Sequence, residues 1–461
     1  MTLLAVIAVG LTPRALEHMP RTRALADEGF QARLDPVLPA VTCSVQATFT
    51  TGLEPSGHGI VANGWYFREL GEVFLWRQHN RLVGGPKVWE RAREVKPDYR
   101  AANVCWWYAM GMTTDFVVTP RPIYRADGRK DPDCYTHPPE LHDRLTGELG
   151  DFPLFTYWGA NANITSSRWI AQATRKLLDE ERLDLLLCYL PHLDYDHQRY
   201  GPGAPESARA ARELDEVLGD LVEHARGRGD TVVVLSEYGI TDASQPIDIN
   251  RRLRSEGLLN VYTQDGMEYL DPWTSRAFAV SDHQIAHVYV RDPGDIPRVR
   301  ELVEGLAGVE RVLDEEGKRD AGLDHPRSGE LVAVAERQAW FTYYYWLDDE
   351  RAPDFAKLVE IHRKPGYDPA ELFMDPNDRF VKLRAGLALA RKFTGFRYKL
   401  DVVPLDPSPV RGSHGRLPET AEDAPVFICS DASIARDRIA ATEVADALLE
   451  LSGAGAATKP N

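Results

Sequence analysis

The chain has 461 residues, 43% of them apolar, which is enough for two or three domains or for one large α/β domain with an inserted lobe. Its net charge of −16 argues against nucleic acid as a partner. The cysteines are odd in number, widely spaced and without a CxxC pair, so we expect reduced thiols and a cytoplasmic protein. They are Cys43, Cys105, Cys134, Cys188 and Cys429.

The first predicted element is a buried strand at Leu3–Leu11, the apolar run LLAVIAVGL. The run is too short to cross a bilayer and lacks a basic segment before it, so a strand is favoured over a signal peptide. No later segment approaches about 18 uninterrupted apolar residues. We therefore expect neither a transmembrane helix nor a membrane partner.

Further apolar runs predict more buried strands, at Tyr99–Trp107, Leu183–Leu190 and Asp230–Ile240. Helical patterns follow two of the strands, at Arg14–Gly29 and Pro205–Arg228. Apolar strands that alternate with amphipathic helices predict an α/β fold, with a mostly parallel central sheet covered by helices on both faces.

The region from about Asn250 to Glu350 has a different character. Aromatic and β-branched residues dominate it, with a helix at Ile296–Ala307, and they predict a smaller inserted α+β lobe. The run at Ala424–Asp431 predicts a strand that returns to the sheet. The expected division is an α/β core with the nucleophile and metal-ligand loops at 1–255, the lobe at 256–350, a return to the core with the His414 loop at 351–450, and a disordered tail at 451–461.

Polar residues follow the predicted strands, where parallel sheets bind their ligands. A hydroxyl, carboxylates and imidazoles at one sheet edge predict a metal site beside a nucleophile. The residues with these groups, or with an amide beside them, are Thr42, Asp194, His197, Gln198, Glu237 and His414. The segment SDHQIAH adds a further group: Asp282, His283 and His287.

Each of these residues also has a plain structural interpretation. Thr42 could cap a helix, Asp194 could cap or form a turn, and His414 could bond to a loop carbonyl. Glu237 could end a strand in a salt bridge. The pair Asn63–Gly64 predicts a turn with positive φ.

The order and spacing of these motifs resemble the alkaline phosphatase superfamily, in particular its type I phosphodiesterase/nucleotide pyrophosphatase branch, which includes phosphonoacetate hydrolases. Thr42 stands ten residues before Gly52 of TGLEPSGHGIVAN, and Asp194 stands seven before Gly201 of DYDHQRYGP. His414 lies in GSHG. The resemblance implies an alkaline-phosphatase-like sandwich with Thr42 as the nucleophile.

The chain also departs from the pattern of that family. Val9 stands where the family has a metal-binding Asp, and SEYG replaces SDHG, so that Glu237 and Tyr238 replace Asp and His. Gln198 stands in the usual place of a His, and Val45 in that of an Asn.

Because of these departures, we expect the two metal sites to differ in how many ligands they keep. The resemblance implies one metal site from Asp194 and His414, with His197 or Gln198 as the third ligand. The second site is depleted and keeps Glu237 and Thr42. The SDHQIAH residues Asp282, His283 and His287 are candidate replacement ligands.

The function that the resemblance implies is metal-dependent hydrolysis of phosphate esters through a phosphothreonine at Thr42. We expect one or two divalent cations per chain, Zn²⁺ first and Mn²⁺ as the alternative. The expected substrate is a small phosphate ester or a nucleotide. Two alternatives stay open: a degenerate member that binds a ligand or partner without hydrolysis, and a C–P bond hydrolase of the phosphonoacetate type. The lobe carries no motif that predicts the exact substrate, and the oligomeric state is not predicted.

Overall fold

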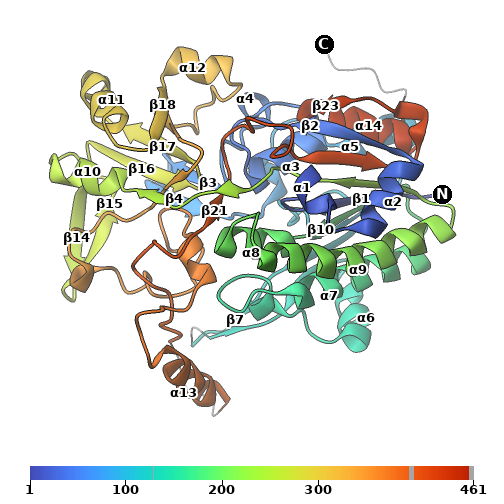
Figure 1. Ribbon diagram of the computed structural model, residues 1–461, viewed down its shortest axis with the longest axis horizontal. Coiled ribbons are helices and arrows are strands. Elements are labelled where there is room, and N and C mark those ends of the chain that lie inside the picture. The colour runs from blue at the N-terminus through green and yellow to red at the C-terminus, as the bar shows by residue number, and fades with distance from the viewer. Residues whose placement is uncertain (128, 394–398, 456–461) are drawn as a thin grey trace.

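A computed structural model describes residues 1–127, 129–393 and 399–455. The described chain forms a central sheet of nine strands in the order β23-β2-β22-β11-β1-β10-β5-β6-β9. Helices cover both faces of this sheet, and a second body with its own smaller sheet lies beside it (Figure 1). The predicted α/β class with a large central sheet is confirmed.

The middle strands of the central sheet are buried on both faces, as their continuous apolar sequences predict. Strand β1 pairs in parallel with β10 and with β11, so the carboxyl ends of all three meet at one edge. The strands of the sheet are β1 (Leu3–Ala8), β2 (Phe30–Asp35), β5 (Ala101–Val104), β6 (Phe116–Pro120), β9 (Cys134–His137), β10 (Leu185–Leu190), β11 (Thr231–Leu235), β22 (Val426–Cys429) and β23 (Arg438–Ala440).

Two groups of helices form the outer layers of this part of the protein (Figure 1). One group contains α2 (Pro20–Glu28), α6 (Glu140–Leu149), α7 (Ile164–Glu180), α8 (His192–Tyr200) and α9 (Pro205–Gly227). The other contains α3 (Thr42–Thr51), α5 (Val88–Val95) and α14 (Val444–Leu451). The short helices α1 (Pro13–Leu16) and α4 (Pro55–His58) complete the core.

One expectation about this core needs correction, and the structure adds the direction of the returning strand. The helix predicted at Arg14–Gly29 is two helices, because Pro20 lacks a backbone N–H and begins α2 instead of continuing α1. The returning strand β22 runs antiparallel to β11. Its direction follows from the preceding pairing of β12 (Thr241–Asp242) with β21 (Gly412–Ser413), which brings the chain back from the carboxyl end of β11.

The predicted lobe contains an antiparallel sheet of order β16-β17-β19-β18 in the described residues. Its apolar core also takes in Ile60, Trp65 and Leu75 from the first quarter of the chain. The lobe boundaries at 256 and 350 therefore stay a prediction. The elements of this part are β16 (Ala277–Asp282), β17 (Ile285–Val290), β18 (Val309–Leu313), β19 (Leu331–Ala335), α10 (Ile249–Ser255), α11 (Ile296–Glu304) and α12 (Glu315–Asp320).

Short two-stranded pairings complete the described strands. They are β3 (Gly64–Phe67) with β4 (Glu72–Leu75), β7 (Ile123–Tyr124) with β8 (Lys130–Asp131), β13 (Gln245–Ile247) with β20 (Ala339–Phe341), and β14 (Asn260–Gln264) with β15 (Met267–Asp271). Helix α13 (Val381–Phe393) projects away from both sheets (Figure 1).

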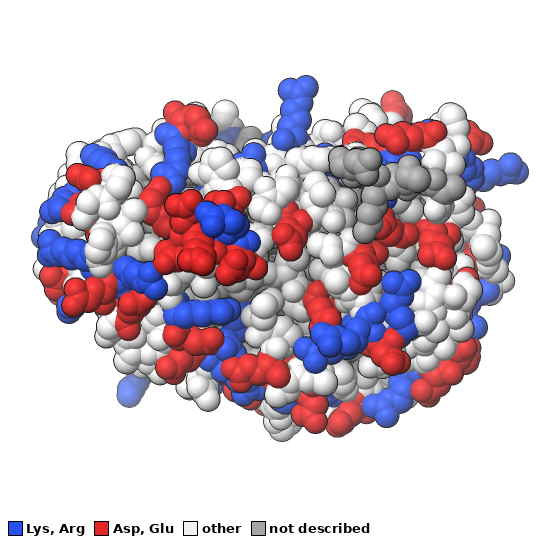
Figure 2. All heavy atoms as spheres, turned by 90° about the horizontal axis from the view of Figure 1, so that it is seen from above, with Lys and Arg blue, Asp and Glu red and all other residues white. Residues whose placement is uncertain are grey.

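The predicted disordered tail at 451–461 is packed at its start. Leu451 ends α14, the Tyr99 hydroxyl donates to Ser452 Oγ at 2.8 Å, and Ala454 is buried. Residues 456–461 lie outside the described chain. On the face drawn in Figure 2, acidic and basic side chains alternate. No helix of the described residues has the length and apolar character needed to cross a bilayer.

Candidate functional site

Thr42 is the first residue of α3, directly after the loop that leaves β2. The helix N-cap is Val41, whose backbone is extended, so Thr42 does not cap the helix. The side chain of Thr42 is buried, and its Oγ1 lies 3.1 Å from the Tyr238 hydroxyl. A buried hydroxyl at a helix N-terminus lies where the helix dipole favours a negatively charged group.

Four rings are stacked beside this hydroxyl. Tyr238 lies flat against His414, with ring centres 3.6 Å apart. His414 contacts His283 at 3.8 Å, and His283 contacts Tyr367 at 3.6 Å. The stack therefore joins the end of β11, the loop before β22, the β16–β17 turn and the segment after residue 360.

His414 enters this stack as a neutral imidazole. Its Nδ1 donates to the Ala40 carbonyl at 2.9 Å, which leaves the lone pair on Nε2. Burial lowers the pKa of His414 well below its ordinary value. The bond to a loop carbonyl that the sequence offered as the plain interpretation is present, and it also orients Nε2 for binding.

Two buried carboxylates lie in the same region, Asp194 on α8 and Glu237 just beyond β11. Among the described residues, Asp194 Oδ1 and Glu237 Oε2 have no hydrogen-bond partner. Burial raises the pKa of Asp194 to about 7. Burial also raises the pKa of Glu237 well above its ordinary value, and the charge of Asp194 raises it further. Two such carboxylate oxygens are suitable ligands for a cation.

Gln46 ties Glu237 to the nucleophile helix. Its Nε2 donates to Glu237 Oε1 at 2.6 Å, and its Oε1 accepts from the Trp107 backbone N–H at 2.6 Å. Gln46 lies four residues after Thr42, so both side chains share one face of α3. No motif in the sequence marks Gln46 as a site residue, and its spacing of four from Thr42 is the signal that points to it.

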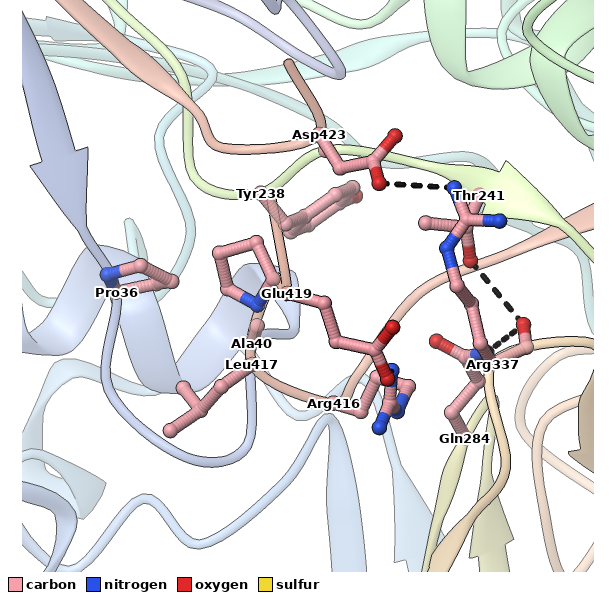
Figure 3. Close-up of a pocket in the computed structure, with 12 residues that line it drawn as sticks. Pro36, Ala40, Tyr238, Thr241, Gln284, Arg337, Arg416, Leu417, Glu419 and Asp423 are labelled. Atoms are coloured by element: carbon pink, nitrogen blue, oxygen red, sulfur yellow. Dashed lines mark hydrogen bonds and ion pairs between the residues drawn. The ribbon is translucent and has the colours of Figure 1, made fainter. Parts of the chain in front are cut away.

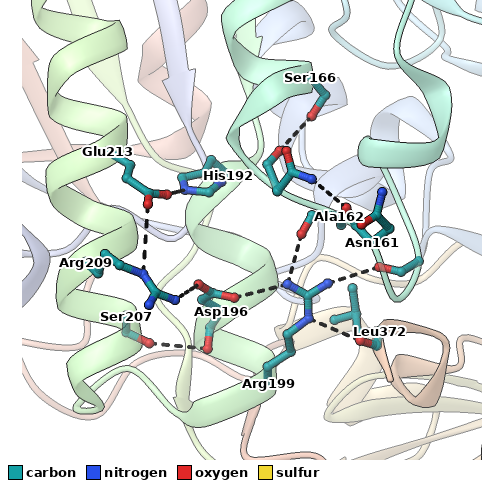
Figure 4. Close-up of polar contacts among 12 residues, drawn as sticks. Asn161, Ala162, Ser166, His192, Asp196, Arg199, Ser207, Arg209, Glu213 and Leu372 are labelled. Atoms are coloured by element: carbon teal, nitrogen blue, oxygen red, sulfur yellow. Dashed lines mark hydrogen bonds and ion pairs between the residues drawn. The ribbon is translucent and has the colours of Figure 1, made fainter. Parts of the chain in front are cut away.

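Helix α8 holds Asp194 through contacts on its outer side (Figure 4). Arg199 donates to Asp196 and to the carbonyls of Ala162 and Leu372, at 3.0–3.1 Å. His192 pairs with Glu213 of α9 at 3.0 Å. The outward residues of α8 are thus anchored to three neighbouring segments, which fixes the direction of its inward residues.

His197 and Gln198 are also buried on α8. Tyr367 donates to Gln198 Oε1 at 2.8 Å. Within the described chain, Gln198 Nε2 and His197 Nδ1 are unpartnered. Burial lowers the pKa of His197 to about 3, so its ring is neutral. His197 Nδ1 lies 3.4 Å from where a Cβ on Gly10 would be, so this imidazole points to the end of β1.

Asp282 and His283 are joined to the nucleophile helix through Asn63. The backbone N–H and Nδ2 of Asn63 donate to Asp282 at 2.7 and 3.0 Å, and Cys43 N–H donates to Asn63 Oδ1 at 2.9 Å. His283 Nδ1 lies 2.7 Å from Asp282 Oδ1. Neither Asn63 nor Gly64 has positive φ, so the expected turn is wrong and Asn63 is instead a bridge.

His287 has a structural role in the described protein. Its Nε2 donates to the Val61 carbonyl at 3.0 Å, and its Nδ1 accepts from Gly329 N–H at 3.1 Å. Both ring nitrogens are therefore used by the backbone, which leaves none for a metal.

The end of β1 offers no ligand, because Val9 is fully buried and belongs to the apolar core. Residues 1–127, 129–393 and 399–455 contain one group of three His, Cys, Asp or Glu ligand atoms within 4.8 Å of one another, and it does not include Thr42 or its neighbours. The donors around Thr42 are thus fewer and more spread out than two complete metal sites require.

A pocket opens beside the ring stack (Figure 3). Its wall includes Tyr238 and Ala40, the residue whose carbonyl binds His414. Arg337 and Arg416 also line it, and each is paired with a carboxylate, Arg337 with Asp423 at 2.8 Å. Tyr238 therefore belongs both to the ring stack and to the wall of this pocket.

Comparison with known proteins gives a consistent family. The sequence profile described as type I phosphodiesterase / nucleotide pyrophosphatase matches residues 3–368. An uncharacterized pyrophosphatase/phosphodiesterase of Schizosaccharomyces pombe is 25% identical over 279 residues, 59% of this chain and 49% of that protein. The chain spans about half the length of the curated relatives it matches.

Solved structures share the fold, among them the following two. Phosphonoacetate hydrolase of Sinorhizobium meliloti, in complex with phosphonoformate, matches with a TM-score of 0.62 and 17% identity over 99% of this chain and 95% of that one. Murine ectonucleotide pyrophosphatase/phosphodiesterase 5, an inactive form in complex with AMP, matches with a TM-score of 0.60 and 15% identity over 100% and 97%. At these identities the likeness is one of fold.

Proposed function

The chain belongs to the type I phosphodiesterase/nucleotide pyrophosphatase family, a family named for hydrolysis of phosphoric esters, and from that premise we propose that it hydrolyses a small phosphoric ester with Thr42 as the nucleophile. One observation carries the proposal. Thr42 begins α3, and its buried hydroxyl lies beside Tyr238 in a cluster that also contains the unpaired carboxylate oxygens of Asp194 and Glu237 in the described chain.

The five free and buried cysteines support a cytoplasmic location.

We propose that one divalent cation binds in this cluster to Asp194, Glu237 and His414, whose ligand atoms do not all lie within 4.8 Å of one another in the described chain and would have to draw together around the ion. Buried carboxylate oxygens without partners are costly, and a bound cation would satisfy them. His414 Nε2 supplies an imidazole ligand, which makes Zn²⁺ the first choice and Mn²⁺ the alternative. A divalent cation held there would lower the pKa of a neighbouring hydroxyl and offset charge on the phosphoryl group.

Other predicted ligands have less to offer. His197 and Gln198 lie on the same helix as Asp194 and could complete the ligand set only by turning. Asp282 and His283 already bind each other, with Asn63 beside them, and we assign them to positioning α3. His287 is left out because both its nitrogens are bonded.

The residues of the chain would then act as follows. Thr42 Oγ1 forms a bond to phosphorus while the bond from phosphorus to the leaving oxygen breaks, and the hydroxyl proton passes to solvent. Tyr238 holds Oγ1 in place through its hydroxyl, and the α3 N-terminus favours the phosphoryl charge. Water then hydrolyses the phosphothreonine and regenerates Thr42.

The test is hydrolysis of bis(4-nitrophenyl) phosphate and 4-nitrophenyl phosphate with added Zn²⁺ or Mn²⁺. We expect turnover by the unaltered chain, loss in Thr42→Ala and partial retention in Thr42→Ser. Thr50→Ala is the matched control, because Thr50 is buried on the same helix and its hydroxyl bonds to helix carbonyls. Equal turnover by Thr42→Ala and Thr50→Ala would contradict the assignment.

A second candidate is ligand binding without hydrolysis. It is favoured by Tyr238, which packs against the face of His414 and bonds to Thr42, and by the apolar Val9. Calorimetric binding of AMP or phosphonoacetate without product formation, over the same metal conditions, would support it. Release of phosphate from phosphonoacetate would instead support cleavage of a C–P bond.

A further inference from the structure

A second group of metal-type ligands lies far along the sheet from Thr42, at its outermost strand. Asp133 and Cys134 stand at the start of β9, and His142 lies in the first turn of α6. One carboxylate oxygen, the thiol sulfur and one imidazole nitrogen all lie within 4.8 Å of one another. We propose that these three residues form a Zn²⁺ site that fastens the edge strand β9 to helix α6.

The imidazole and the carboxylate already face each other. His142 Nε2 lies 2.8 Å from Asp133 Oδ1, and the Cys134 backbone N–H donates to the same oxygen at 2.8 Å. Neighbouring ligands of one tetrahedral zinc ion, with bonds of about 2.0–2.3 Å, are separated by roughly 3–4 Å. A small outward movement of His142 and Asp133 would therefore admit the ion between them and the sulfur.

The other nitrogen of His142 has the partner that zinc-bound histidines commonly have. His142 Nδ1 lies 2.9 Å from Asp143 Oδ1. A carboxylate on this nitrogen fixes the tautomer and the ring orientation, and it leaves Nε2 for the metal. The two carboxylates also raise the pKa of His142, because each accepts a hydrogen bond from the charged ring, so a zinc ion would have to displace the Nε2 proton to bind there.

The donor set selects the ion. A thiolate, an imidazole and a carboxylate suit Zn²⁺, whereas Mg²⁺ and Ca²⁺ prefer oxygen ligands. Burial raises the pKa of the Cys134 thiol to about 12, and the charges of Asp133 and Asp151 raise it further. A bound cation would offset those negative charges. Three protein ligands leave the fourth position to water or to Asp151.

The site would act on the fold rather than on substrate. Strand β9 is the last strand of the sheet and pairs with β6 on one side. An ion bound to β9 and α6 links the unpaired edge to its covering helix, and binding to the folded chain alone raises stability by mass action.

The experiment is to load the full chain with Co²⁺ in place of Zn²⁺ and to record the near-ultraviolet absorption of thiolate bound to cobalt. The chain carries Asp194→Ala, which removes the proposed metal ligand beside Thr42. We expect about one equivalent of thiolate-bound Co²⁺, lost in Cys134→Ser and kept in Cys429→Ser, which alters another buried thiol. Absence of the band, or a band unchanged by Cys134→Ser, would overturn the proposal.

Asp143→Asn tests the site without disturbing the interior, because the Asp143 side chain is 95% exposed. Loss of a carboxylate partner of a zinc-bound histidine weakens metal affinity about 10- to 100-fold, and we expect that change in a Zn²⁺ competition titration. Unchanged affinity would show that His142 and its two carboxylates form only an ion pair. Glu140→Gln, a change in the same turn of α6, is the matched control.

Discussion

Replacing Asp194 by Asn should stabilise the metal-free protein at neutral and alkaline pH. The Asp194 side chain is 9% exposed, and its Oδ1 has no partner among described residues. Its charge is therefore poorly solvated in the folded chain and well solvated in the unfolded one. Asn keeps the size of the side chain and removes the charge.

The size of the effect follows from the pKa. Burial raises the pKa of Asp194 from 3.8 to about 7. The pKa of Asp194 is higher in the folded chain than in the unfolded chain. The stability that the protonated Asp194 contributes is therefore fully present below about pH 4 and is lost as pH rises toward 7. A difference of about 3 in pKa corresponds to at most about 4 kcal/mol at pH 8, and to about 1.5 kcal/mol at pH 5.

The assay is urea unfolding at pH 5 and pH 8 with a chelator present, comparing Asp194→Asn with the unaltered chain. The expected gain is larger at pH 8. Asp196→Asn is the matched control on the same helix: Asp196 is ion-paired with Arg199 at 3.1 Å, so this change should destabilise. Adding Zn²⁺ should stabilise the unaltered chain more than Asp194→Asn, which keeps only the Zn²⁺ site proposed at β9. A loss of stability in Asp194→Asn at pH 8 would show that the Asp194 charge does not destabilise the folded chain.

Three further changes test other parts of the cluster. Tyr238→Phe removes the hydroxyl bonded to Thr42, and kcat should fall up to about 10-fold, the equivalent of one hydrogen bond; an unchanged kcat would separate Tyr238 from catalysis. His287→Ala should lower the free energy of unfolding by about 2 kcal/mol in urea titrations while metal content by elemental analysis stays the same, and a fall in metal content would make His287 a ligand. Asn63→Ala removes the Nδ2 donor to Asp282 and the Oδ1 acceptor of the Cys43 N–H, while the backbone N–H of residue 63 still donates to Asp282. The change should cost about 1–3 kcal/mol and reduce kcat, whereas full activity would show that α3 needs no such bridge.

The central strands could be predicted because they are apolar on both faces. The runs at Leu3–Leu11 and Leu183–Leu190 contain β1 and β10, whose pairing brings their carboxyl ends together. The direction of β22 could not be predicted in the same way, since the direction of a strand depends on where the chain re-enters the sheet. That entry is set by the distant β12–β21 pairing.

The candidate site was predictable to the level of single residues only where a motif marked them. Thr42 and Glu237 meet through Gln46 and Tyr238, contacts between segments almost 200 residues apart that no local pattern specifies. His283 and His287 both belong to the segment SDHQIAH, but their surroundings differ. His283 lies in the ring stack, whereas His287 bonds to backbone groups. Burial and long-range packing decide these roles.

The group of Asp133, Cys134 and His142 could not be predicted from the sequence, for a different reason. Cys134 and His142 are eight residues apart, without the short paired spacings that mark zinc motifs. The turn between β9 and α6 brings them together. This site also means that the total metal content of the chain does not by itself count the ions beside Thr42.

The most direct test of the central claim is to trap the reaction intermediate on Thr42. Metal-loaded protein is mixed with 4-nitrophenyl phosphate, quenched in acid within one turnover and analysed by peptide mass spectrometry. We expect a phosphoryl group on Thr42, present in the unaltered chain and in Thr50→Ala and absent from Thr42→Ala. Turnover with no phosphoryl group on the chain, or with the group on another residue, would contradict it.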